Sequence, residues 1–280
     1  MNLSEIKIVA DSSADLLTLD GVDFCSAPLK IITAQNEYVD TEELNVLDMV
    51  NDLKAYKGKS STSCPNASDW LCAFGDAKYV FCVTITATLS GSYNAAVLAK
   101  QTFEEEHPER RVFVLNSLTA GPEIALIIEK IRELVLGGED FESVCQKAEE
   151  YADNTGLLFM LESMKNLANN GRVSPIVARM AGLMGIRVIG KASAKGDLEP
   201  LNKCRGEAKA FEAIVTNLKE QGFKGGRIKI AHCFNENAAK ALAELIICEF
   251  AETQIDIYPC RALCSFYAES GGMLVGFEKM

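Results

Sequence analysis

The sequence has little of the chemistry that most enzymes and cofactor-binding proteins display. It contains two histidines in 280 residues, His107 and His232, and neither stands in a nucleophile pattern such as G-x-S-x-G. It has no G-x-x-x-x-G-K-[ST] phosphate loop and no dinucleotide fingerprint. A serine nucleophile needs a neighbouring base, and no base is evident beside Ser90 or Ser92. The sequence therefore disfavours a hydrolase, and it implies no cofactor.

Other features that the sequence lacks limit the cellular location of the protein and the classes of ligand it could bind. No apolar run reaches the roughly 18 residues that suggest a membrane span, and no secretory signal is visible. The 10 cysteines include no C-x-x-C pair and no zinc-type spacing, so we expect free thiols and no metal site. The formal net charge of -11 disfavours nucleic acid and anionic membrane surfaces. We expect a cytoplasmic protein without stable membrane insertion.

The elements present in the first half indicate an α/β fold. Short apolar runs alternate with helical patterns, and Tyr79 to Thr86, rich in β-branched and aromatic residues, is the clearest strand. Uniformly apolar strands that alternate with helices predict a mostly parallel sheet with helices on both faces. The other expected strands are Lys7 to Ala10, Ala27 to Thr33, Arg111 to Leu115 and Gly156 to Leu161, and the helices are Val46 to Tyr56, Ala67 to Phe74, Tyr93 to Glu106 and Ile124 to Leu136.

The second half has a different pattern and predicts a smaller α+β domain. Val188 to Lys191 and Leu198 to Arg205 flank Lys195-Gly196-Asp197, which is typical of a hairpin turn. A boundary near Asp153 to Gly156 would divide the chain into an N-terminal domain, residues 1–155, and a C-terminal domain, residues 156–280. Helices are expected over Pro175 to Met184, Glu207 to Gln221 and Glu236 to Phe250, and strands over Arg227 to Cys233, Gln254 to Tyr258 and Met273 to Glu278.

Small hydroxyl-bearing residues follow three of the predicted strands. In an open parallel sheet, ligands bind outside the carboxyl ends of the strands. Asp11-Ser12-Ser13 follows the first strand, Thr88 to Asn94 the third and Asn116-Ser117 the fourth. Each cluster taken alone is first of all a helix cap. Three clusters at one edge of the sheet predict a polar cleft, with helix N-termini that suit an anion.

Two further segments carry candidate ligand-binding residues. Ser60 to Ser63 places four hydroxyls before a proline and a helical pattern, either as a solvated loop or as a loop that faces a ligand's head group. Arg172 lies between Asn170-Gly171, a left-handed helix end, and the helix cap Ser174. It is either a surface charge or a contact for an anion or a partner, because guanidinium suits carboxylate and phosphate.

Together these motifs resemble the DegV family, the fatty-acid-binding proteins that serve bacterial fatty acid kinase. The resemblance covers nearly the whole chain, and the order and spacing of the motifs are more specific than any single motif. The family patterns D-S-T-A-D-L, T-S-x-P-S, L-S-G-T-Y-x-x-A and G-G-R-I-S are matched by Asp11 to Leu16, Thr62 to Asn66, Leu89 to Ala96 and Asn170 to Ser174. The patterns L-x-I-K-P-I and G-x-L-x-P are matched by Leu183 to Ile189 and Gly196 to Pro200.

The resemblance implies a non-enzymatic protein that holds a long-chain fatty acid in a cleft between its domains and presents it to a kinase. It places the carboxylate at Ser and Thr hydroxyls and the tail in an apolar pocket, and it places Arg172 at the kinase or at the head-group opening. The candidate ligand-binding residues are Thr62, Ser63, Ser90, Gly91, Ser92, Asn94, Ser12, Arg172, Glu269 and Ser270. Candidate lining residues, a type that is more often plain core, are Phe159, Leu161, Ile176, Met180, Leu183, Met184 and Ile186.

One departure from the family pattern bears on the ligand. The family usually has H-T-G-P-G, with its histidine at the head group, where this chain has Glu269 to Met273. Two ionised carboxylates at close range repel, so either one binds a proton, Glu269 points elsewhere, or the ligand differs. Two alternatives stay open. One is a hydrolase- or transferase-type enzyme with Glu269 as base near Ser90 or Ser92, and the other is a carrier of a different amphipathic ligand.

Overall fold

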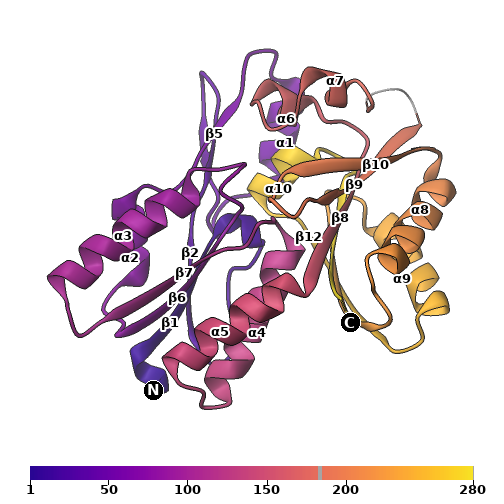
Figure 1. Ribbon diagram of the computed structural model, residues 1–280. Coiled ribbons are helices and arrows are strands. Elements are labelled where there is room, and N and C mark those ends of the chain that lie inside the picture. Colours follow the sequence, from indigo (N-terminus) through magenta and orange to yellow (C-terminus); the bar gives the residue numbers. More distant parts are fainter. Residues whose placement is uncertain (182–184, 280) are drawn as a thin grey trace.

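The computed structural model describes residues 1–181 and 185–279 and arranges them around two large sheets (Figure 1). The N-terminal sheet has the strand order β2-β1-β6-β7, and all its neighbouring strands run parallel. The predicted parallel α/β sheet is thus confirmed. Its strands are β1 (Ile6–Asp11), β2 (Asp23–Ala27), β6 (Tyr79–Thr84) and β7 (Arg111–Asn116). Its helices are α2 (Ala67–Phe74), α3 (Ser92–Glu106), α4 (Pro122–Leu136) and α5 (Phe141–Asp153).

Helices cover both faces of this sheet, as its apolar strands require. In β6, Val80 and Cys82 pack with α2 and α3, whereas Phe81 and Val83 pack with α4 and α5. Neighbouring side chains of a strand point to opposite faces, so a strand between two helical layers must be apolar at every position. The run of apolar residues from Tyr79 onward meets that requirement.

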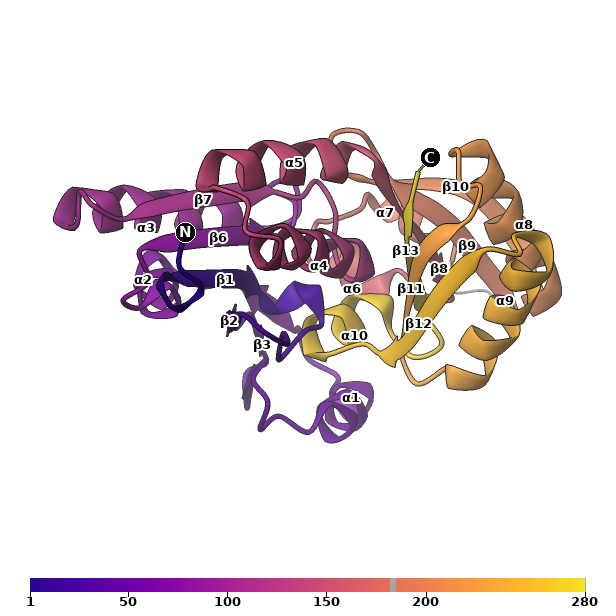
Figure 2. The same cartoon turned by 90° about the horizontal axis from the view of Figure 1, so that it is seen from below.

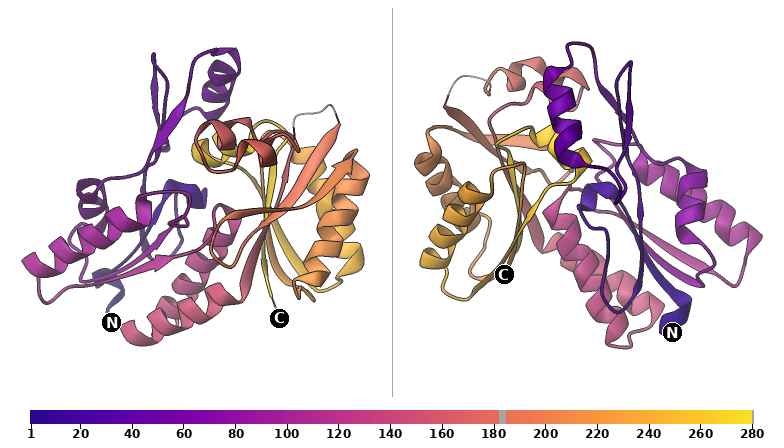
Figure 3. Two further views of the ribbon diagram at one scale, coloured as in Figure 1. Left: turned by 45° about the horizontal axis from the view of Figure 1, so that its top comes forward. Right: turned by 180° about the vertical axis from the view of Figure 1, so that it is seen from behind.

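A small antiparallel sheet, ordered β4-β3-β5, stands off one end of the parallel sheet together with α1 (Figure 3). The single strand predicted over Ala27 to Thr33 is wrong: β2 ends at Ala27, and Pro28, which has no backbone N–H, separates it from β3. The loop predicted over Ser60 to Ser63 is in part a strand, because β5 pairs with β3 and sets Thr62 opposite Ile31. The elements are β3 (Lys30–Ile32), β4 (Glu37–Val39), α1 (Val46–Ala55) and β5 (Ser61–Ser63).

The C-terminal sheet is mixed, with the order β10-β9-β8-β13-β11-β12. β11 and β12 pair in parallel, and the other neighbours are antiparallel. α8 and α9 cover its outer face, and α4 lies on the side of the N-terminal sheet (Figure 2). The elements are β8 (Thr155–Leu161), β9 (Ile186–Ala192), β10 (Leu198–Arg205), α8 (Glu207–Glu220), β11 (Gly226–His232), α9 (Glu236–Glu249), β12 (Thr253–Pro259) and β13 (Met273–Glu278).

The strand predicted over Gly156 to Leu161 forms as β8, and the two sequence arguments about it disagree, because the predicted bounds put it in the C-terminal domain. The alternating pattern groups it with the strands of the first half, whereas β8 joins the C-terminal sheet and pairs antiparallel with β9 and β13. An apolar run indicates a buried strand but does not say which sheet the strand enters. The domain bounds 1–155 and 156–280 stay a prediction.

Three short α-helices remain in the described ranges, and the sequence prediction captured one of them in part. The helix predicted from Pro175 ends at Ala178, because Met180 and Ala181 bond back three residues instead of four. The predicted end at Met184 lies outside the described residues. All three lie near the interface of the sheets: α6 (Lys165–Asn169), α7 (Pro175–Ala178) and α10 (Ala262–Ala268). The sequence analysis did not predict α6, α10 or the longer α5. Within the described ranges, none of the helices is both long and apolar enough for a membrane crossing.

Candidate functional site

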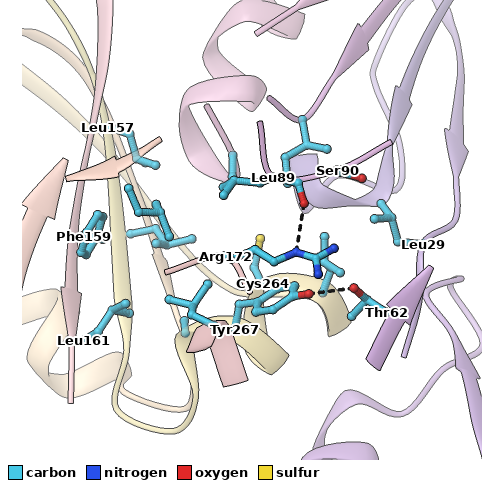
Figure 4. Close-up of a pocket in the computed structure, with 17 residues that line it drawn as sticks. Leu29, Thr62, Leu89, Ser90, Leu157, Phe159, Leu161, Arg172, Cys264 and Tyr267 are labelled. Carbon is cyan, nitrogen blue, oxygen red and sulfur yellow. Dashed lines mark hydrogen bonds between the residues drawn. The ribbon is translucent and has the colours of Figure 1, made fainter. Parts of the chain in front are cut away.

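A mostly apolar pocket lies between the two large sheets (Figure 4). One wall comes from β8, where Leu157, Phe159 and Leu161 face the pocket while Leu158 and Met160 join the core under α8 and α9. Because successive side chains of a strand alternate in direction, one apolar run builds both a core and a pocket wall. The other lining residues are Leu29, Thr62, Ile85, Leu89, Ser90, Ala120, Leu167, Arg172, Leu198, Leu263, Cys264, Tyr267, Ala268 and Leu274.

The pocket is narrow. Counted as room for the centres of water-sized spheres, its volume is about 80 Å³. A single water needs roughly 10–15 Å³ by the same measure, so the space has room for only a handful of water molecules. A slender, flexible apolar chain fits such a space better than a broad, rigid ligand does.

Four polar side chains lie on the side of the pocket away from β8 (Figure 4). The hydroxyl oxygens of Thr62 and Tyr267 are 2.7 Å apart and share a hydrogen bond. The Nε of Arg172 donates to the carbonyl oxygen of Leu89 at 3.1 Å, and its guanidinium carbon lies 6.0 Å from the centre of the Tyr267 ring. With Ser90, these residues form a polar end that carries one positive charge; no carboxylate is among the described lining residues.

The ordinary state of Tyr267 is the neutral phenol. Burial raises the pKa of Tyr267, against the opposing effects of the hydrogen bond to Thr62 and the charge of Arg172. The hydroxyl therefore keeps its proton at neutral pH and remains a hydrogen-bond donor. A pocket end with hydroxyl donors and a guanidinium suits an anionic head group.

The loop residues Ser12 and Ser92 hold the site together and do not line the pocket. The carboxylate of Asp11 accepts from the Ser92 hydroxyl at 2.6 Å and from the backbone N–H of Ile85 at 2.9 Å. Burial raises the pKa of Asp11, while these hydrogen bonds oppose the rise. The Ser12 hydroxyl oxygen accepts from the N–H of Leu29 at 3.0 Å. The hydroxyl clusters thus tie the ends of β1 and β6 together and fix the loop that carries the pocket residue Ser90.

Two carboxylates from the N-terminal half hold the start of α10. Asp40 accepts from the N–H of Leu263 at 3.0 Å, and Asp15 accepts from the N–H of Arg261 at 2.8 Å. Burial raises the pKa of Asp15 to about 8, and it raises the pKa of Asp40 against its bond from Leu263 and the charge of Arg261. The first N–H groups of a helix have no partner within the helix. These two carboxyl groups therefore fix α10, and with it Tyr267, against the N-terminal half.

Glu269 and Ser270 face a second, polar cavity of about 650 Å³ on the other side of α10. The Oε1 of Glu269 accepts from the Ser163 hydroxyl at 2.9 Å and from the N–H of Asn166 at 3.1 Å. The structure therefore does not bring Glu269 to Ser90 or Ser92. The enzyme alternative requires Glu269 to lie beside Ser90 or Ser92, and these residues do not meet.

The remaining predicted residues are placed as follows. Phe159 and Leu161 line the pocket, whereas Ile186 lines the second cavity. Ile176 is 77% exposed, and Leu183 and Met184 lie outside the described residues. The predicted residues that are described but do not line the pocket are Ser12, Ser63, Gly91, Ser92, Asn94, Ile176, Met180, Ile186, Glu269 and Ser270. Of the predicted ligand-binding residues, the pocket brings together Thr62, Ser90 and Arg172.

Sequence reasoning missed the contribution of α10. Leu263, Cys264, Tyr267 and Ala268 all line the pocket, and their spacing places them on one face of a helix. That spacing was the available signal. The segment is seven residues long, so it shows less than two full turns of periodicity.

The fold and the pocket define a two-domain α/β protein with a narrow apolar site between its sheets and a guanidinium and hydroxyls at one end. The chain belongs to the DegV family: the family model described as "Uncharacterised protein, DegV family" matches residues 5–279. A DegV domain-containing protein of Streptococcus pneumoniae is 42% identical over 276 residues, which cover 97% of this chain and 98% of the relative.

Solved structures of similar proteins hold acyl ligands. The Streptococcus pneumoniae fatty acid kinase B3 protein, loaded with linoleic acid, is 42% identical, with a TM-score of 0.96 and coverage of 98% of this chain and 99% of that one. A DegV family protein from Eubacterium eligens, loaded with heptadecanoic acid, is 39% identical, with a TM-score of 0.96 and coverage of 98% and 100%. A Ruminococcus gnavus relative, refined with vaccenic acid, is 29% identical, with a TM-score of 0.90 and coverage of 99% and 100%.

Proposed function

We propose that this protein binds a long-chain fatty acid, holds it without chemical change and presents it to a kinase partner. The observation that carries the proposal is the pocket itself: a narrow apolar space whose polar end has Arg172 and three hydroxyls. Relatives of 39% and 42% identity whose structures hold heptadecanoic and linoleic acid support the choice of ligand.

The tail of the acid would lie against the apolar lining. Leu157, Phe159 and Leu161 supply one wall, and Leu263 and Leu274 lie on the other elements that close the space. Each methylene removed from water contributes roughly 0.8 kcal/mol. Because this term adds up along the chain, it favours long acids over short ones and supplies most of the affinity.

The carboxylate would lie at the polar end. The Ser90 hydroxyl oxygen accepts from the N–H of Ser92 at 3.3 Å, so its own proton remains for a ligand. Arg172 uses its Nε and Nη1 for the carbonyl oxygens of Leu89 and Asn170, and its Nη2 has no protein acceptor among the described residues. Hydrogen bonds to an ionised carboxylate are roughly twice as strong as neutral ones. These donors can therefore hold the head group without the proton that a nearby Glu269 would require.

Presentation to a kinase rests on a different kind of support. The relative from Streptococcus pneumoniae is described as a fatty acid kinase B3 protein. In this chain, Arg172 lies in the segment that follows α6. It is half-buried and lines the polar end of the pocket. A partner that reaches the head group would meet this residue first.

Organic extraction of the purified protein, followed by mass spectrometry, tests the proposal. We expect about one fatty acid per chain, and delipidated protein should take up oleic acid but not a short acid such as butyric acid. An empty extract, together with no uptake of oleic acid by the delipidated protein, would exclude the acyl ligand. A mixture of the protein with a fatty acid kinase subunit and ATP should yield acyl phosphate if the kinase proposal is right.

A further inference from the structure

Helix α10 separates the two cavities, and its C-terminal end turns different side chains into each. Tyr267 lines the apolar pocket, whereas Glu269 lines the polar cavity and is held there by Ser163 and Asn166. α10 ends at Ala268, and Glu269 follows it with a positive φ of 56°, so the side chain of Glu269 leaves the chain in a different direction from that of Tyr267. With Tyr267 in the pocket, Glu269 does not also face the head group, so the donor that the pocket gains from this helix is the phenol.

The hydroxyls of Thr62 and Tyr267 together have one proton more than their mutual hydrogen bond uses. They are 2.7 Å apart, either can be the donor, and neither forms another hydrogen bond among the described residues. Each hydroxyl has one proton to donate. One proton lies between the two oxygens, and the second has no protein acceptor. Burial raises the pKa of Tyr267, so both protons are present at neutral pH.

We propose that Thr62 and Tyr267 act as one two-hydroxyl donor for the carboxylate of the ligand, with Tyr267 serving as the head-group residue of α10 in place of Glu269. This inference rests on the proposed function, because it names residues that recognise the same ligand. Either hydroxyl can give the second proton to a carboxylate oxygen while the other orients it. A chain of hydrogen bonds also polarises its members, so the donated bond is strengthened.

The sharing of one hydrogen bond makes the two residues partly redundant. In a Thr62→Val variant, Tyr267 still has its own proton, and in a Tyr267→Phe variant, Thr62 still has its own. Each single variant loses only the orientation and polarisation by the partner. The double variant loses the donor altogether, and its loss should exceed the product of the two single losses. If the hydroxyl pair only tied β5 to α10, the loss of affinity in the double variant would not depend on the carboxylate head group of the ligand.

The test is a double-mutant cycle on delipidated protein, with oleic acid and its methyl ester as probes. We expect the dissociation constant for oleic acid to rise about two- to fivefold in each single variant, since one oriented neutral hydrogen bond is weakened. In T62V/Y267F it should rise about 30- to 100-fold. The ester keeps the tail but has no charge, so its affinity should change less than about threefold throughout. Thermal unfolding of each variant reports its folding.

Three outcomes would overturn the inference. A double variant that matches T62V would show that Tyr267 takes no part, and equal losses for acid and ester would show a structural tie alone. Wild-type protein that binds neither probe would overturn the proposed function and this inference together. Tyr258→Phe is the matched control, because Tyr258 has a buried hydroxyl without a partner in the described structure and does not line the pocket. Its affinity for oleic acid should equal that of the wild type.

Discussion

The two cavities beside α10 differ in almost every respect although they share one helix. The pocket of Tyr267 is narrow, at about 80 Å³, and mostly apolar, with Arg172 as its charged lining residue. The cavity of Glu269 is larger, at about 650 Å³, and its lining mixes charged residues such as Lys54 and Lys165 with apolar ones such as Leu53. An acyl chain loses more contact with water in the first, because its lining is mostly apolar. The second can hold ordinary water, which makes it a poor site for an apolar ligand.

The comparison shows that the position of a residue in a motif does not decide which cavity it serves. Glu269 lies at the place where the family pattern puts a head-group residue, yet it accepts hydrogen bonds from Ser163 and Asn166. Tyr267, two positions earlier and outside any motif, is the residue that reaches Thr62. The backbone at each position, helical at Tyr267 and with a positive φ just past the helix at Glu269, decides which cavity the side chain meets.

Replacing Arg172 by alanine should break the polar end of the acyl pocket and give the largest single effect. A hydrogen bond to a charged group contributes about 1.5–3 kcal/mol, so the dissociation constant for oleic acid should rise roughly 10- to 100-fold. Arg172→Lys should lie between the alanine variant and the wild type, because it keeps the charge but loses the planar donors. Calorimetric titration of delipidated protein measures both. An alanine variant with wild-type affinity would remove Arg172 from the head-group site.

Replacing Asp15 by asparagine tests what holds α10 between the cavities. The pKa of Asp15 is raised to about 8 in the folded protein by burial, from an ordinary value of 3.8. Between these two values the unfolded chain binds fewer protons than the folded one, so this group costs stability as the pH rises from about 4 to about 8. The asparagine of the variant does not titrate, and its amide oxygen can still accept from the N–H of Arg261.

Melting temperatures measured across that range provide the check on Asp15. The difference between Asp15→Asn and the wild type should shift by several degrees in favour of the variant between about pH 4 and about pH 8, and then level off. The exposed Asp197→Asn is the control and should show no such trend. A difference that stays constant with pH, or shifts the opposite way, would contradict the raised pKa of Asp15.

Replacing Glu269 by glutamine should have the smallest effect and so sharpen the contrast between the cavities. The glutamine side chain of the variant can still accept from the Ser163 hydroxyl and the N–H of Asn166, and this position lines only the polar cavity. We expect affinity for oleic acid to stay within about twofold of the wild type, since no head-group bond is lost. A tenfold change in either direction would place Glu269 at the ligand after all.

Much of the fold could be predicted from local patterns. The strand from Tyr79 is apolar from Val80 to Val83 because it lies between two helical layers, and the helix from Ile124 shows its 3.6-residue spacing because one face is buried. β2 and the small sheet were harder. Pro28 interrupts the apolar run there, and the three-residue strands give too few positions for a period to show.

Of the residues that the sequence singled out for a ligand, the pocket brings together Thr62, Ser90 and Arg172. A similar hydroxyl in the same loop turns inward and does not line the pocket. Ser92 is two positions from Ser90, yet its hydroxyl donates to the buried Asp11. Whether a hydroxyl faces a ligand or a core carboxylate depends on the neighbouring strand end, which no local pattern contains.

The sequence by itself determined the apolar strands, the turn residues, the positive charge of Arg172 and the order of the family's motifs. These are properties of short segments, and local periodicity and residue chemistry are enough to produce them. The tertiary structure alone decided that β8 pairs with β9 and β13, that Thr62 meets Tyr267 across 205 residues of chain, and that Glu269 faces away. The reason is that a pocket is made by contacts between segments distant in sequence, and packing of the whole chain sets which side of each helix or strand meets it.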